Sequence, residues 1–134
     1  MLTQEQKQET VNRVVAFMAK QREPSHNGES CAYLEQNRQC AIGCLLTEEQ
    51  CIEAENKAYS VTRIVRLGWN GWAHEDGNFL SRLQSCHDEA YVEMMEEEVP
   101  FLVSFDTYIS EFCKHWKLVH PGGLELTEAE EVDE

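Results

Sequence analysis

Two stretches of the chain repeat apolar residues every three or four positions, as the buried face of a helix does. In the first, the apolar positions are Val11, Val14, Val15 and Met18. In the second, they are Phe105, Tyr108, Ile109, Phe112, Cys113 and Trp116. Thr3 and Gln6 have the spacing of a capping box, so the first helix is predicted from about Gln4 to Lys20, with Pro24 preventing its continuation.

The stretch Cys31–Leu46 is patterned differently and reads as two short strands followed by a turn. Cys31–Leu34 and Gln39–Ile42 are predicted to pair as a β-hairpin, with Asn37 in the left-handed conformation between them. Gly43 then permits a sharp turn or a close approach to a neighbouring segment. A two-stranded hairpin is marginal alone, so we expect it to pack on helices.

Four further helices are predicted between residues 47 and 98. Thr47 and Gln50 form a second capping-box pair, which begins a helix ending near residue 56. Residues 59–67 keep helical spacing despite many β-branched side chains. Two helices then follow the loop after Gly68, the second of them capped by Asp88.

The predicted fold class is therefore α+β, a mostly helical single domain with one small antiparallel β-hairpin. Residues 1–120 form this domain, and the acidic segment 121–134 is expected to be a disordered tail. The residues expected in the core are Val14, Tyr33, Ile42, Leu45, Leu83, Ile109 and Phe112.

The net charge of −14 opposes direct binding to nucleic acid phosphates. Residues 121–134 contribute six acids and no Lys or Arg, so residues 1–120 still carry −8 of the −14. This charge favours a protein partner with a basic surface. The sequence contains neither an apolar run long enough to span a membrane nor a signal-peptide pattern at its start, so we expect a cytoplasmic protein without membrane contact.

Six cysteines in a cytoplasmic chain are expected to be reduced and mostly buried. No two of them form a C-x-x-C pair. Cys31, Cys40 and Cys44 with His26 could supply four zinc ligands, but their spacing matches no standard zinc motif. We therefore expect neither a metal nor another cofactor.

Three short motifs occur in a recognisable order. They are Cys31-Ala32-Tyr33, then Cys40-Ala41-Ile42-Gly43-Cys44-Leu45-Leu46, and then Leu80-Ser81-Arg82-Leu83-Gln84-Ser85-Cys86-His87-Asp88. The chain resembles small phage and prophage proteins of unassigned function across most of residues 5–118. Leu34 departs from the pattern, which has arginine at that place. The resemblance implies a phage origin, action in the cytoplasm of the host cell, and no particular reaction.

Two chemical sites are open alternatives. Cys40 or Cys44 could act as a nucleophile with His87 as base and Asp88 nearby, although Asp88 is also a natural helix cap and His87 lies on an apolar helix face. The turn at Gly43 and Cys44 could bind an anion through backbone N–H groups, with Arg38 as the cation. The second alternative describes a nucleotide or small-ligand binding protein.

The function that we expect first is binding of a host protein, including the inhibition of a defence or nucleic-acid-handling factor. Trp69 and Trp72 flank a polar turn and are candidate interface anchors, or else they close one end of the core. The acidic run is expected to join them in one surface and to speed association with a basic partner. Its members are Glu93, Glu96, Glu97 and Glu98.

Overall fold

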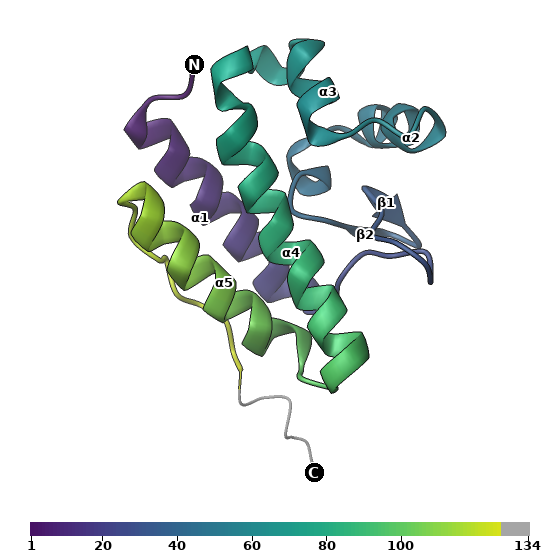
Figure 1. Cartoon of the computed structure of the whole chain (residues 1–134), viewed down its shortest axis with the longest axis vertical. Helices are drawn as coiled ribbons and strands as arrows, with labels where there is room; N and C mark the ends of the chain where they lie inside the picture. The colour runs from purple at the N-terminus through teal and green to yellow at the C-terminus, as the bar shows by residue number, and fades with distance from the viewer. Residues whose placement is uncertain (127–134) are drawn as a thin grey trace.

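Helix α4 (Gly77–Glu97) is the longest element and lies at the centre of the fold (Figure 1). The computed structural model describes residues 1–126. Helices α1 (Gln4–Gln21) and α5 (Phe101–Trp116) lie on one side of α4, and α2 (Glu48–Asn56), α3 (Val61–Arg66) and a two-stranded sheet lie on the other. The short 3₁₀ turns are η1 (Gly43–Leu45), η2 (Trp69–Gly71) and η3 (His74–Asp76). The predicted class, a mostly helical α+β domain with one antiparallel hairpin, is confirmed.

Both predicted capping boxes are present. At α1, the Gln6 backbone N–H donates to Thr3 Oγ1 at 3.0 Å and the Thr3 N–H donates to Gln6 Oε1 at 2.9 Å. At α2, Thr47 and Gln50 exchange the same two bonds at 3.1 and 3.0 Å. These bonds satisfy N–H groups that have no partner within the helix, so the sequence defines both helix starts locally.

The hairpin is shorter than predicted. Strands β1 (Leu34–Glu35) and β2 (Arg38–Gln39) pair across a two-residue turn in which Gln36 and Asn37 have φ of 50° and 68°. Two consecutive left-handed residues match the twist of a hairpin, and the conformation predicted for Asn37 is confirmed. Cys31 makes only an isolated bridge to His26, and the chain enters a helical turn after Cys40, so the outer parts of the predicted strands were wrong.

Helix α4 continues through Asp88, so the predicted helix break at that residue was wrong. The Asp88 carboxylate accepts hydrogen bonds from side chains of its own helix instead of capping a new one. The apolar positions keep one period on both sides of it, from Phe79 to Tyr91. The chain turns only at Glu98, which is left-handed, and Pro100 then precedes α5.

The core between these helices contains six of the seven residues predicted for it. Val14, Ile42, Leu45, Leu83, Ile109 and Phe112 are buried. Tyr33 is only half-buried, because its hydroxyl donates to the Tyr59 carbonyl at 2.7 Å near the surface.

Residues 117–126, which we call the C-terminal strap, lie against α1. Gln4 donates to the carbonyls of Trp116 and Lys117, Gln8 bonds both the N–H and the carbonyl of Val119, and Arg22 donates to the Glu125 carbonyl. Leu118, Leu124 and Leu126 pack on the core. The rest of the expected acidic tail, 127–134, is outside the described residues. Within residues 1–126, no helix combines the length and apolar character needed to cross a membrane.

Candidate functional site

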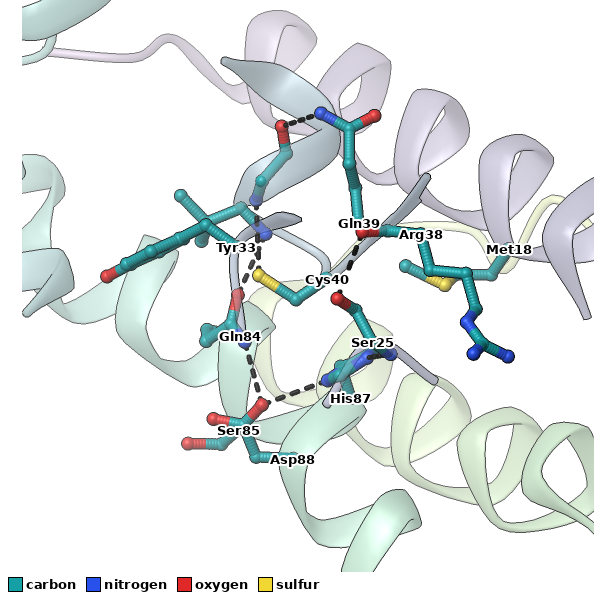
Figure 2. A network of polar contacts seen from close by, with 12 residues as sticks. Met18, Ser25, Tyr33, Arg38, Gln39, Cys40, Gln84, Ser85, His87 and Asp88 are labelled. Carbon is teal, nitrogen blue, oxygen red and sulfur yellow. Dashed lines mark hydrogen bonds and ion pairs between the residues drawn. The ribbon is translucent and has the colours of Figure 1, made fainter. Parts of the chain in front are cut away.

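A chain of buried and half-buried polar contacts joins three segments beside α4 (Figure 2). The Ser25 backbone N–H donates to His87 Nε2 at 3.0 Å, so the ring proton is on Nδ1, which donates to Asp88 Oδ1 at 2.9 Å. Gln84 Nε2 donates to the same Asp88 oxygen at 2.7 Å, while Gln84 Oε1 accepts from the Ile42 N–H at 2.8 Å. We call these five residues the His87–Asp88 network.

The helical period brings the network together. Gln84, His87 and Asp88 are three and four residues apart, so they share one side of α4. His87 and Ser25 are both fully buried. The Ser25 hydroxyl also donates to the Arg38 carbonyl at 3.0 Å, which ties the network to the hairpin. A buried polar network in which each member is paired fixes one arrangement of the segments it joins.

Gly43 completes the junction by allowing two backbones to touch. A Cβ atom on Gly43 would lie 2.2 Å from the Tyr33 carbonyl oxygen. Its N–H donates to Cys40 Sγ at 3.3 Å, and its carbonyl accepts from Gln39 Nε2 at 2.9 Å. The three sequence motifs, around Cys31, Cys40 and His87, therefore meet at one place in the fold.

The anion site considered as an alternative at this turn does not assemble. The N–H groups of Gly43, Cys44 and Leu45 all donate within the turn, and Gly43 and Cys44 are buried. The Arg38 guanidinium pairs with Glu23. Gly43 is explained by close packing rather than by a bound phosphate.

The geometry also opposes the alternative of a cysteine enzyme. Cys40 and Cys44 are buried, and burial raises the pKa of the Cys44 thiol to about 12. The Cys44 thiol donates to the Ala41 carbonyl at 3.1 Å, and no bond joins either thiol to His87. His87 Nε2, the nitrogen that a base would use, is already occupied by Ser25.

Cys31 is the thiol that the structure places with His87 and Asp88, and the catalytic hypothesis had not included it. One ligand atom from each of the three lies within 4.8 Å of the others. The carboxylate, however, contacts both other groups, whereas activation of a thiol requires imidazole in that position. Burial and the neighbouring Asp88 charge raise the pKa of the Cys31 thiol, so the group does not generate a thiolate.

The same three residues are the one group of potential metal ligands found within residues 1–126. The alternative zinc set with His26, Cys40 and Cys44 does not come together there. A metal on His87 Nδ1 would place the ring proton on Nε2, directly opposite the Ser25 N–H. Metal-bound histidines instead donate their second N–H to an acceptor, so the polarity of the network does not suit a metal.

The tryptophans expected as interface anchors close one end of the core. Trp72 is 9% exposed. Trp69 is half-buried, and its ring meets Tyr59 edge to face at 5.9 Å between centroids. Their alternative reading, as a cover for the core, is the one that the burial favours.

The four glutamates of the acidic run fall into two groups, one bonded to α5 and one exposed to solvent. Glu93 accepts from Ser104 Oγ at 2.7 Å and from the Tyr108 hydroxyl, which ties α4 to α5 and lowers the Glu93 pKa. Glu96, Glu97 and Glu98 are exposed at the end of α4. The tryptophans precede the start of this 21-residue helix, about 30 Å away along its axis. The acidic run and the tryptophans therefore lie near opposite ends of α4 and do not form one continuous patch.

Comparison of the chain with family models, curated proteins and solved structures finds no match.

Proposed function

We propose that this small acidic protein binds and modulates a partner protein through the exposed C-terminal end of α4. We call this surface the α4 acidic end and define it by its exposed residues, Glu89, Val92, Met95, Glu96, Glu97 and Glu98. The partner is a protein with a basic surface, including one that normally holds nucleic acid. The resemblance to phage proteins makes a host protein the expected partner.

The observation that carries this proposal is three exposed carboxylates at a helix C-terminus. The helix macrodipole is negative at that end, so each acid there costs about 0.3–1 kcal/mol. Residues 88–98 contain six acids and no Lys or Arg. Within residues 1–126, the ion pair between Arg38 and Glu23 is the only one made by a lysine or arginine. A basic partner would neutralise carboxylates that the chain leaves unpaired.

Apolar side chains lie among these carboxylates. Val92 is 44% exposed and Met95 is 57% exposed. Glu89, Val92 and Glu96 follow each other at three- and four-residue spacing and share a helix face. Methionine adapts to the shape of a partner, so this end offers contact area as well as charge.

A charge-neutral triple variant tests the proposal. Glu96→Gln, Glu97→Gln and Glu98→Gln together remove three charges at nearly constant side-chain volume. The matched control removes three exposed charges from α2, with Glu48→Gln, Glu49→Gln and Glu53→Gln. Partners captured from host lysate are identified and purified, and their binding to each variant is measured at low and high salt.

We expect the α4 variant to associate more slowly and to lose most of the salt dependence of binding, because exposed charges steer encounter and are screened by ions. The α2 variant should bind like the unmodified chain. Equal binding by both variants, or a partner retained without any salt dependence, would show that the α4 acidic end is not the contact surface.

A further inference from the structure

A cavity of about 410 Å³ lies beside the His87–Asp88 network. The segment Cys31–Tyr33 forms one wall, the end of α2 with Ala54 and Glu55 forms another, and Gln84 and Asp88 of α4 form a third. Small-ligand sites commonly measure about 300–1,000 Å³. Gln84 and Asp88 are members of the network, and the Ala32 N–H donates to the carbonyl of Ser25, another member, at 3.1 Å. Two of the three walls are therefore fixed by the network.

The charged groups of this cavity are all acidic. Glu55 and Asp88 line it, and no Lys, Arg or His does. The Cys31 and Cys40 thiols in the same lining stay protonated, because burial and the Asp88 charge raise their pKa. The groove between α4 and α5 differs, since Arg82 and His115 face Glu89 and Glu111 there.

Both carboxylates retain capacity for another donor. Gln84 and His87 both donate to one oxygen of Asp88, Oδ1, the Cys31 thiol is a third neighbour of this carboxylate, and the Asp88 side chain is 41% exposed. Glu55 accepts the Tyr33 N–H through Oε2. An ionised carboxylate has about four acceptor positions, so a ligand with several N–H groups can bond to either acid without displacing a protein donor.

Two tyrosine rings complete the lining and suit a cation. Tyr33 and Tyr59 both face the cavity, and aromatic rings attract ammonium and guanidinium groups. We propose that this cavity binds a small organic cation, an alkylammonium or alkylguanidinium compound, whose head group lies against Asp88 and Glu55. This site is separate from the α4 acidic end and does not depend on partner binding.

The test uses N-butylguanidinium as the probe and N-butylurea, a neutral analogue of similar shape, as the comparator. Each is titrated into the ¹⁵N-labelled chain, and the amide signals are followed by NMR. We expect saturating shifts around Cys31–Tyr33, Glu55 and Asp88, with a Kd of about 1 mM or tighter, and binding of the urea at least about tenfold weaker.

Variants then locate the cation. Asp88→Asn keeps an oxygen that accepts from Gln84 and His87, and Glu55→Gln keeps one for the Tyr33 N–H, so the fold should persist. Each should weaken binding about tenfold to a hundredfold, the factor expected for loss of one charge-assisted hydrogen bond. Glu49→Gln, an exposed acid of α2, is the control and should change nothing.

Three results would overturn the proposal: no saturation by the guanidinium, equal binding of the urea, or equal weakening by Glu49→Gln. If Asp88→Asn shifts the Ser25 and Ile42 amide signals in the absence of ligand, this variant has disturbed the network. The affinity of Glu55→Gln for N-butylguanidinium is then the deciding measurement, because Glu55 is outside the network. The triple α4 variant should bind the guanidinium normally, which keeps this result independent of the proposed function.

Discussion

Replacing Gly43 with alanine tests the junction between the Tyr33 segment and η1. Gly43 does not have a positive φ, so its backbone conformation is open to alanine, which would ordinarily stabilise a helical turn. The added Cβ, however, would lie 2.2 Å from the Tyr33 carbonyl oxygen and 3.0 Å from its carbon. Normal contact requires the backbones to separate by roughly 1 Å. Because the obstacle is backbone, we expect a loss of about 2–4 kcal/mol, at the upper end for overpacking.

Urea denaturation measures that loss directly as a change in the free energy of unfolding. Gly77→Ala is the matched control, because Gly77 has helical φ and ψ and no atom within 4 Å of an added Cβ. That change should be neutral or stabilise the protein by up to about 1 kcal/mol. If Gly43→Ala proves as stable as Gly77→Ala, the close approach of Tyr33 does not exist in solution.

Three other predictions concern the core, pH and the thiols. Leu83→Ala, at a fully buried position, should cost about 2–5 kcal/mol in urea denaturation, and a cost below about 1 kcal/mol would contradict its central position. The hydrogen bond to the Glu93 carboxylate raises the Tyr108 pKa to about 12, above the unfolded value of about 10. On the alkaline side, this bond therefore contributes fully to the free energy of unfolding up to about pH 10, and the contribution is lost as pH rises through 12. The same bond lowers the Glu93 pKa, so on the acid side its contribution to the free energy of unfolding is lost as pH falls through the lowered pKa. Replacing Tyr108 with phenylalanine should remove both pH dependences, which urea denaturation across the pH range would measure. Burial raises the pKa of Cys44 and Cys86 to about 12, so iodoacetamide at pH 8 should modify these two thiols only after unfolding. Rapid labelling of Cys44 or Cys86 in the native chain, located by mass spectrometry, would refute their burial.

The helices could be predicted because their signals are local. Each capping box is written in four consecutive residues, and each buried face repeats within its own helix. The ends of the hairpin could not be predicted in this way. The Gln39 backbone bonds the Gln21 amide of α1, and the Ile42 N–H bonds Gln84 of α4, which is 42 positions later. These long-range side-chain partners take backbone groups that a longer ladder would have used.

In the candidate site, too, local features could be predicted and long-range contacts could not. His87 and Asp88 were identified from their adjacent polar chemistry on an apolar helix, but their roles depend on Ser25, which is 62 positions away. Cys31 was recognised as a ligand type, while only the fold shows that it lies with Asp88. Charge gave no sign that Glu93 bonds α5, because Ser104 and Tyr108 are neutral.

The C-terminal strap has a consequence for synthesis on the ribosome. Gln4, Gln8 and Arg22 bond backbone groups that lie 103 to 113 positions later in the chain. These side chains are therefore translated more than one hundred residues before the backbone groups that they bond. Until then, the outward face of α1 is open to chaperones and proteases in the cell. A ribosome stalled before residue 117 would therefore carry an α1 whose Gln4, Gln8 and Arg22 still lack these backbone partners.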